Sequence, residues 1–305
     1  MTDKPSLMRY MWLAIGAAIV TILLKSVAYW LTSSVGLLSD ALEGFVNLAA
    51  AITALFLLRV VERPPDEAHE FGHDKAGYFS SGVEGTLIVV AAISIIYAAT
   101  RRLLEPQPIE QPGIGLAIAV GASLINLVVG QLLIRVGKRE DSIVLEADGR
   151  HLMSDVWTSV GVVIGVTLAV WTGLTWLDPV VALVMGAKIG WEGLRILWRS
   201  LAGLMDSALP AAERTRIESV LNRYRGEGIR WHALRTRRSG ARRFITVHIL
   251  APGDWPLQRA HDLVERIEAE IRDLIPNAVI VIHLEPSGDP AAEHDTGLDR
   301  VSWPV

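Results

Sequence analysis

Two short stretches of the sequence carry polar side chains at matching intervals within otherwise apolar runs. In each stretch three such residues occupy positions i, i+3 and i+7, a spacing that places all three on one face of an α-helix. Ionisable side chains inside membrane-spanning helices commonly mark an ion pathway or binding site. The two triads are Asp40, Glu43 and Asn47, and Asp148, His151 and Asp155.

The two triads complement each other as metal ligands. Glu43 and Asn47 offer two oxygens from one helix. His151 and Asp155 offer a nitrogen and an oxygen from the other. If the two helices face each other, these four groups make a tetrahedral cage of the kind that zinc prefers.

Three further charged residues accompany this cage. Asp40 and Asp148 begin the triads, and we expect them to lie beside the ligands and support them. Lys25 stands alone in the preceding apolar run, where snorkelling or pairing with a carboxylate such as Asp40 is a simpler interpretation than a role in chemistry. The alternative for the triads is a scatter of polar residues near helix ends, which their matched spacing disfavours.

The composition places these residues in a membrane. Of 305 residues, 51% are hydrophobic and 20% are charged, whereas a soluble protein has about 25% charged residues. Charges are sparse before residue 200 and frequent after residue 210, so a membrane-embedded first part and a soluble second part are predicted. The lack of cysteine leaves histidine and carboxylates as metal ligands, and a net charge of −4 without a basic stripe excludes a nucleic-acid partner.

Six apolar stretches reach the roughly 20 residues that a helix needs to cross a lipid bilayer. Six crossings put both termini on one side, and basic residues cluster in the segments on that side, as is typical of cytoplasmic loops. Arg101 and Arg102 run against this pattern and are outnumbered. The sequence therefore predicts a multi-pass protein of the cell (inner) membrane with both termini cytoplasmic. The predicted spans cover residues 8–31, 35–58, 79–100, 112–136, 143–172 and 176–198.

The segment after the last span is predicted to form a small soluble domain. Its order of elements, helix–strand–strand–helix–strand, is typical of an α+β ferredoxin-like or metallochaperone-like domain. We expect a six-helix transmembrane domain over 1–205, a cytoplasmic metal-binding and dimerisation domain over 206–288, and a disordered tail over 289–305. The elements predicted in the soluble domain are helices over 211–224 and 257–274 and strands over 231–238, 242–250 and 279–285.

The soluble domain carries four histidines, which we interpret as part of a zinc cluster. Strand alternation places His283 and Glu285 on one face of the last strand, while the other histidines come from three separate segments. A single histidine is more often a hydrogen-bonded surface residue, but four in one small domain favour bound metal. The predicted ligands are His232, His248, His261, His283 and Glu285.

A third candidate site lies in the loop between the second and third spans. Asp66, His69 and His73 repeat the i, i+3, i+7 spacing, so on one helical face they would form a surface zinc site. The alternative is a solvated turn whose histidines bind nothing, and the residues alone favour that alternative.

Three stretches of the sequence combine into a recognisable pattern. They are residues 33–41 (SSVGLLSDA), residues 146–148 (EAD) followed by His151 and Asp155, and the loop 63–76 (RPPDEAHEFGHDKA). Together with six spans before a cytoplasmic domain, the pattern resembles the cation diffusion facilitator family, and the loop is similar to that of its bacterial zinc/iron efflux branch. The resemblance covers about residues 8–286.

The resemblance implies a homodimeric secondary transporter, not an enzyme, that exports a divalent cation from the cytoplasm in exchange for protons. It implies that the four-residue cage is the transport site, that the loop holds a second metal site, and that Zn²⁺ bound to the cytoplasmic cluster acts as a regulator. The branch has an opposite-charge interlock at the positions of Lys75 and Asp206. We therefore predict a salt bridge between these two residues that holds the dimer or couples the two parts.

Three positions depart from the family pattern. The branch usually has Asp, or His with Asp, where this chain has Glu43 and Asn47, and it often has Asp in place of Glu285. An amide oxygen is a neutral, weaker donor than a carboxylate, so the transport site loses one negative charge. Zinc is the first choice of ion, and iron(II), manganese, cobalt, nickel and cadmium stay open.

Two rival functions belong to other classes. A membrane zinc hydrolase needs a base beside an open coordination position, typically in a His-Glu-x-x-His pattern, and the sequence contains no such pattern. A non-transporting metal sensor or assembly factor, with a membrane site weakened at Asn47, stays open as the alternative.

Overall fold

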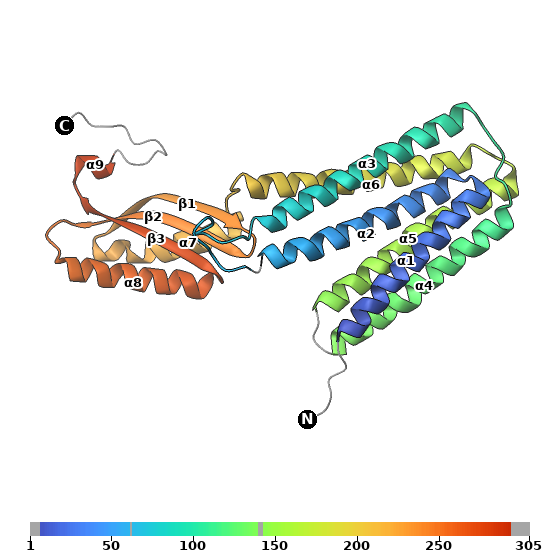
Figure 1. Cartoon of the computed structure of the whole chain (residues 1–305). Helices are drawn as coiled ribbons and strands as arrows, with labels where there is room; N and C mark the ends of the chain where they lie inside the picture. Colours follow the sequence, from blue (N-terminus) through green and yellow to red (C-terminus); the bar gives the residue numbers. More distant parts are fainter. Residues whose placement is uncertain (1–6, 62, 140–142, 294–305) are drawn as a thin grey trace, which may run out of the picture. The chain divides into compact units, whose positions relative to one another are not determined.

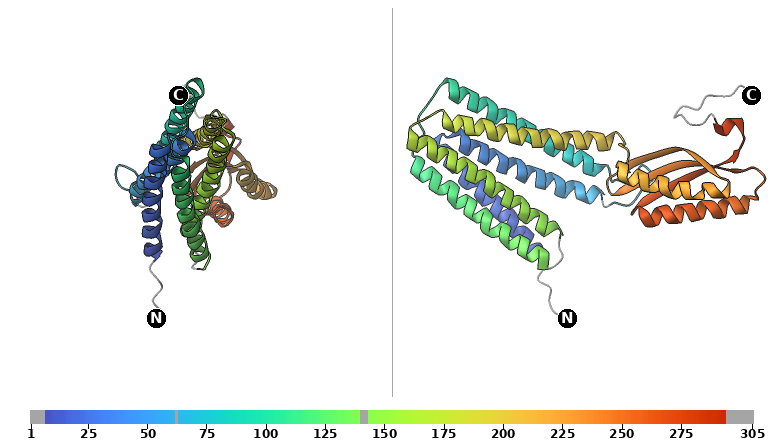
Figure 2. Two further views of the ribbon diagram at one scale, coloured as in Figure 1. Left: turned by 90° about the vertical axis from the view of Figure 1, so that its right-hand side faces the viewer. Right: turned by 180° about the vertical axis from the view of Figure 1, so that it is seen from behind.

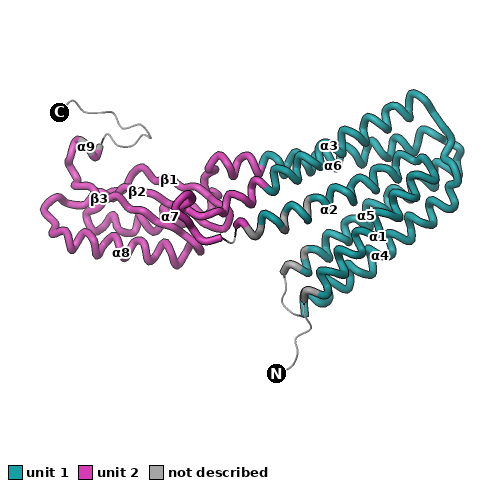
Figure 3. The backbone as a smooth tube through the Cα atoms, in the orientation of Figure 1, with its two compact units in different colours: residues 1–57, 80–198 teal, residues 58–79, 199–305 magenta. Residues whose placement is uncertain are grey.

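The computed structural model describes residues 7–61, 63–139 and 143–293. Contacts divide the chain into two compact units, one formed by residues 1–57 and 80–198 and the other by residues 58–79 and 199–305 (Figure 3). The loop after the second helix thus shares a unit with the C-terminal residues, whereas the predicted domain boundary at residue 205 groups this loop with the transmembrane helices. Of the predicted tail, residues 294–305 lie outside the described residues.

Six long helices of the described chain correspond to the six predicted spans (Figure 1). Stretches of α1, α3, α4 and α5 are long and apolar enough to cross a membrane. In α6 the residues Lys188, Glu192 and Arg195 interrupt the apolar sequence. The chain therefore has a helical membrane domain in which six crossings remain a prediction. The helices are α1 (Leu7–Thr32), α2 (Val35–Val61), α3 (Ala76–Leu104), α4 (Pro112–Arg139), α5 (Ile143–Thr172) and α6 (Leu177–Leu204).

Helices α4 and α5 approach each other closely because glycines remove side chains from their interface. A Cβ atom on Gly149 would lie 2.7 Å from the carbonyl oxygen of Gly130, so neither position has room for a larger residue. Helix α1 packs beside this pair, as both views show (Figures 1 and 2). Small residues at such contacts allow backbones in a membrane to come together.

The start of α2 is fixed by a carboxylate from another helix. Asp178 in the first turn of α6 is fully buried and accepts hydrogen bonds from Ser34 Oγ at 2.6 Å, Val35 N at 2.9 Å and Gly36 N at 3.1 Å. The first amides of a helix have no partner within the helix, and an acidic group placed there also complements the helix dipole. Asp178 therefore determines where α2 begins, and with it which face of α2 its polar triad occupies.

The C-terminal part of the second unit has the predicted order of elements. Strands β1 and β2 are antiparallel, and β2 and β3 are parallel, giving the sheet order β1-β2-β3. The predicted ends differ from the observed ones by at most two residues. The elements are α7 (Ala211–Arg223), the 3₁₀ turn η1 (Tyr224–Glu227), β1 (Arg230–Ser239), β2 (Arg242–Pro252), α8 (Leu257–Leu274), β3 (Ala278–Ser287) and the short helix α9 (Pro290–Glu293).

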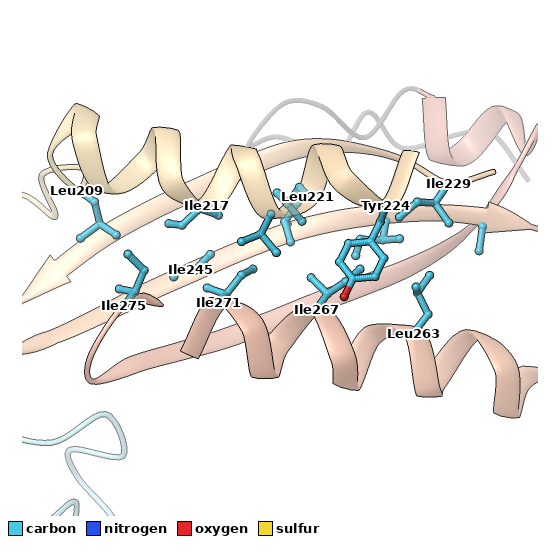
Figure 4. Packing of buried hydrophobic residues seen from close by; sticks show 14 residues of the cluster. Leu209, Ile217, Leu221, Tyr224, Ile229, Ile245, Leu263, Ile267, Ile271 and Ile275 are labelled. Carbon is cyan, nitrogen blue, oxygen red and sulfur yellow. The ribbon is translucent and has the colours of Figure 1, made fainter. Parts of the chain in front are cut away.

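One face of this sheet carries the core of the domain. Ile245, Val247 and Ile249 alternate along β2 and are completely buried against α7 and α8 (Figure 4). Burying side chains of this size stabilises a fold by about 1.5–3 kcal/mol each. Because side chains of a strand alternate, the residues between them, including His248, point to the face that the helices leave open.

Candidate metal sites

The membrane unit contains a cavity of about 110 Å³ lined by residues of both polar triads. Asn47 of α2 and Asp148, His151 and Asp155 of α5 all contribute to its wall. The amide nitrogen of Asn47 lies 3.5 Å from Asp155 Oδ1, and Asp155 is buried while His151 is exposed. Three of the four predicted transport ligands therefore surround one space.

Glu43 is half-buried on α2 and is not among the described residues that line this space. In the described part of the chain, its carboxylate does not form a group with His151 and Asp155 in which all ligand atoms lie within 4.8 Å. The complete four-ligand cage is therefore not assembled in this conformation.

The charge beside the cavity is balanced by a buried ion pair. Lys25 Nζ lies 2.7 Å from Asp40 Oδ1, and both side chains are at most 5% exposed. Ser159 Oγ donates a second hydrogen bond of 2.7 Å to the same oxygen. The pairing expected for Lys25 is confirmed, and Asp40 binds α1 and α5 to α2.

The cavity also reaches a residue that the sequence analysis did not predict as part of the site. Asn126 of α4 is 2% exposed, lines the cavity, and its Oδ1 accepts no hydrogen bond among the described residues. Its one sequence signal is an amide in an apolar helix, four residues before Gly130, which contacts α5.

The three candidate ligands of the loop lie together, although on a different backbone from the predicted helix. Asp66, His69 and His73 bring their ligand atoms within 4.8 Å of one another. His69 Nδ1 lies 3.1 Å from Asp66 Oδ1, and His73 Nε2 lies 3.3 Å from Asp66 Oδ2. The residues occupy turns and an isolated bridge between Asp66 and His69, so the prediction of one helical face was wrong.

The chemistry of the loop cluster suits a cation. Desolvation opposes ionisation of Asp66, but hydrogen bonds from His69 outweigh it and hold the pKa of the Asp66 carboxyl below its usual value. His73 Nδ1 is buried without a hydrogen-bond partner among the described residues, while its Nε2 faces the cluster and Asp66 Oδ2. One carboxylate and two imidazoles make a donor set that zinc accepts.

On the open face of the sheet, three histidines stand in one row. His232 pairs with His248, and His248 with His283, across the three strands, and neighbouring ring centroids lie 5.1 and 5.0 Å apart. Glu285 is 7% exposed, and its oxygens lie 2.9 Å from His232 Nε2, 3.2 Å from His248 Nδ1 and 3.4 Å from His283 Nε2. The ligand atoms of His232, His248 and Glu285 all lie within 4.8 Å of one another.

The fifth predicted ligand of this cluster lies elsewhere in the chain. His261 belongs to α8, which packs on the opposite face of the sheet, and its side chain is 58% exposed. Its Nε2 lies 4.0 Å from Glu265 Oε1, one turn further along the same helix. Within one chain, the structure therefore brings four of the five predicted residues together and leaves His261 apart.

Lys75 and Asp206 form the predicted ion pair, with 2.9 Å between Nζ and Oδ1. Arg237 of β1 also reaches Asp206 Oδ1, at 3.1 Å, a contact that was not predicted from the sequence. The hydrogen bond from Lys75 is the largest cause that holds the pKa of Asp206 below its usual value, and the bond from Arg237 adds to it. Asp206 thus joins the loop to the sheet of the second unit.

Comparison with known proteins agrees over nearly the whole chain. The family model for the cation efflux transmembrane domain matches residues 11–205, and that for the cation efflux protein cytoplasmic domain matches residues 209–287. An uncharacterized transporter of Synechocystis sp. is 50% identical over 281 residues, which are 92% of this chain and 91% of the relative. The cation-efflux pump FieF of Yersinia pestis is 33% identical over 273 residues, 90% of each protein.

Among solved structures, the metal-bound C-terminal domain of the CzcD transporter from Thermotoga maritima is 28% identical, covering 26% of this chain and 92% of that domain with a TM-score of 0.24. The family matches agree with the apolar helices of the first unit and the α+β domain of the second. The chain belongs to the cation efflux family, and it is a multi-pass divalent-metal transporter of the cation diffusion facilitator type.

Proposed function

We propose that this protein exports a divalent transition-metal cation from the cytoplasm and takes up protons in exchange. The observation that carries the proposal is the cavity shared by Asn47, His151 and Asp155 between helices of an otherwise apolar bundle. Ionisable groups at membrane depth are costly and persist where they serve a substrate or proton path.

Zinc is the first choice for the transported ion. Carboxylates from Glu43 and Asp155 would neutralise a dication, and the His151 imidazole would add a nitrogen ligand that suits zinc. Glu43 would have to move toward the cavity to complete the cage. Iron(II), manganese, cobalt, nickel and cadmium accept the same donor types and remain candidate substrates.

Proton exchange follows from the chemistry of the same residues. An imidazole binds metal only when it is neutral, and imidazoles titrate near physiological pH. Protonation of His151 and of one carboxylate would therefore expel the cation, and proton entry down its gradient would drive export.

The remaining features are assigned to topology and regulation. We propose six crossings of the inner membrane, both termini in the cytoplasm, and a homodimer formed through the C-terminal domain. The loop cluster of Asp66, His69 and His73 would capture cations near the entrance. His232, His248, His283 and Glu285 would hold regulatory zinc, with His261 able to join only by a rearrangement or from another chain.

Transport can be tested with the full chain in proteoliposomes under a proton gradient. Uptake of zinc, iron(II), manganese, cobalt, nickel and cadmium is measured separately. His151→Ala is expected to abolish the flux, whereas Ser154→Ala, an exposed change on the same helix, should preserve it. Equal flux in the wild type and His151→Ala would eliminate this mechanism.

A second candidate function is a non-transporting metal sensor or assembly factor. Two observations favour it: Asn47 provides an amide in place of a carboxylate, and among the described residues the Glu43 carboxylate forms no close ligand group with His151 and Asp155. Asn47→Asp separates the two functions. A large gain of flux from a near-zero wild-type level would indicate a natural site too weak for transport, whereas a change in metal preference alone would indicate a tuned transporter.

A further inference from the structure

We propose that Asn126 of α4 is a further substrate-contacting residue, whose amide oxygen the transported dication contacts while it occupies the membrane cavity. The inference rests on the proposed transport function and extends its ligand set to a third helix. Asn126 contributes to the same wall as Asn47, His151 and Asp155.

The first argument is the state of the Asn126 side chain. The residue is 2% exposed, and its Oδ1 is buried without a hydrogen-bond partner among the described residues. Buried carbonyl oxygens are almost always paired, because water no longer compensates the loss of a partner. A cation in the cavity, or a water molecule of its hydration shell, supplies the missing partner.

The second argument is how α4 directs this side chain. Asn126 precedes Gly130 by four residues, so the two lie on one face of α4. Gly130 is in backbone contact with Gly149 of α5, and a Cβ on Gly149 would lie 2.7 Å from the Gly130 oxygen. That face of α4 is therefore held against α5, which carries His151 and Asp155.

The third argument is charge. Lys25 also lines the cavity, but its ammonium group is neutralised by Asp40 at 2.7 Å. Asp148 and Asp155 then leave the wall with a formal charge of −2, which matches a dication. A cavity of about 110 Å³ also has room for a partly hydrated ion, since one water occupies roughly 30 Å³ in the liquid.

Asn126 has a consequence for ion selection. Asn126 adds one more oxygen donor to a site with a single imidazole nitrogen, and carboxylate and carbonyl oxygens suit manganese, whereas imidazole suits zinc. Loss of the Asn126 oxygen is therefore expected to weaken manganese transport more than zinc transport.

The test compares initial rates of Mn²⁺ and Zn²⁺ uptake by the full chain in proteoliposomes. Asn126→Leu keeps a branched side chain of similar shape and removes the oxygen. Asn126→Asp restores an oxygen with a charge. Ser123→Ala is the matched control, because Ser123 lies one turn away on the same helix, is buried, and bonds only the Ala119 carbonyl at 2.9 Å.

Asn126→Leu is expected to raise KM for Mn²⁺ by about 10-fold, with a smaller rise for Zn²⁺ and a saturating rate within about twofold of the wild type. Asn126→Asp should bring KM for Mn²⁺ back to the wild-type value or lower, and Ser123→Ala should leave both ions unchanged. An unchanged KM in Asn126→Leu overturns the proposal. So does a fall in saturating rate that Asn126→Asp does not restore, because that result is the signature of a purely structural residue.

Two outcomes need a second measurement. If Asn126→Leu fails to insert into the membrane, Asn126→Asp is compared with the wild type instead. A lower KM for Mn²⁺ in Asn126→Asp supports the contact, and an equal KM overturns it. If the wild type transports nothing, the proposed function fails. The contact with Asn126 is then tested by Mn²⁺ binding to purified chains in which the loop and sheet clusters are disabled by removing His69 and His232. One binding site lost in Asn126→Leu supports the contact, and equal binding overturns it.

Discussion

At the scale of single residues, Glu285 holds the open face of the sheet together. Its two carboxylate oxygens lie within 3.4 Å of nitrogens from three histidines, one on each of the three strands of the sheet. The carboxylate is 7% exposed, whereas the His283 side chain is 52% exposed. Imidazole nitrogens and a carboxylate are donors that zinc accepts, so the cluster can hold a zinc ion.

Glu285→Gln is therefore expected to weaken zinc binding by the sheet cluster by at least about 10-fold, because the change removes the one charge that the three histidines share. The measurement is a calorimetric titration of the full chain in detergent. Glu218→Gln is the control, since Glu218 is an exposed residue of α7 that pairs with Arg214 of the same helix. A zinc isotherm that does not change in Glu285→Gln would contradict a ligand role.

The two amides of the cavity differ in how far the sequence could reveal them. Asn47 stands seven residues after Asp40, and the spacing alone places it on a polar face. Asn126 has no carboxylate or histidine at a helical interval in its apolar helix, so no periodicity marks it. Its place beside α5 depends on the contact between Gly130 and Gly149, which is a property of two helices and not of one.

At the scale of elements, α2 depends on α6 for its first turn. Asp178 accepts hydrogen bonds from two backbone amides and from Ser34, and none of its surface is exposed. The Ser34 hydroxyl in turn accepts a hydrogen bond from Leu37 N at 3.2 Å. This arrangement sets the rotation of α2, and hence the direction of Asp40 and Asn47 one and three turns later.

Asp178→Ala is expected to destabilise the first turn of α2 by about 2 kcal/mol, the upper end for loss of a helix cap. Hydrogen–deuterium exchange of the full chain should then be faster at residues 35–37, with a smaller effect in the rest of the helix. Glu192→Gln, an exposed change on α6, serves as control. Unaltered exchange at residues 35–37 in Asp178→Ala would show that the cap is dispensable.

The elements also show where sequence patterns stop being sufficient. The starts of α2 and α4 at residues 35 and 112 coincide with the predicted starts, because apolar runs begin there. The prediction of one helical face for the loop with Asp66, His69 and His73 failed for local reasons. Two prolines precede Asp66, its carboxylate bonds the amides of Ala68 and His69, and Gly72 has φ of +84°, all of which favour turns. The three candidate ligands nevertheless lie close together on the observed turns, so their cluster does not require the predicted helix.

His261 illustrates the opposite case. The sequence placed it correctly on the helix between the last two strands, yet it could not say which face of the sheet that helix covers. Helix α8 packs on the apolar face with Ile245 and Ile249, whereas His248 points to the open face. The sheet therefore separates His261 from the other histidines of the same chain.

At the scale of the whole molecule, the loop after α2 is built into the C-terminal unit. Arg242 of β2 pairs with Asp74 at 3.1 Å and donates to the Phe71 carbonyl at 3.2 Å. The ring of Phe71 meets that of Phe244 edge-on, with centroids 5.7 Å apart. The loop cluster and the sheet cluster thus belong to one body, in which Phe244 and His248 occupy the same face of β2.

Asp206 is the residue on which this attachment is most easily tested, because Lys75 of the loop side and Arg237 of the sheet share its carboxylate. Asp206→Lys places three cations together. It is expected to speed hydrogen exchange in residues 63–75 and to lower both metal flux and the dimeric fraction. The exposed pair itself contributes only about 0.5–1 kcal/mol, so the effect on exchange should be local. Lys75→Asp combined with Asp206→Lys should recover part of the loss.

The same ion pair predicts a pH window. Because the pKa of Asp206 is lower in the folded chain than in the unfolded one, the stabilisation is complete above the unfolded value of about 4 and is lost as the pH falls through the folded value. Loop protection factors, which are exchange rates corrected for the intrinsic pH dependence of amide exchange, should therefore not change through this pair between pH 5 and 8, while flux changes in that range if protons drive export. A loop that loosens together with flux between pH 7 and 5 would contradict this separation. Asp206→Lys with unchanged dimerisation and flux would show that the contact couples nothing.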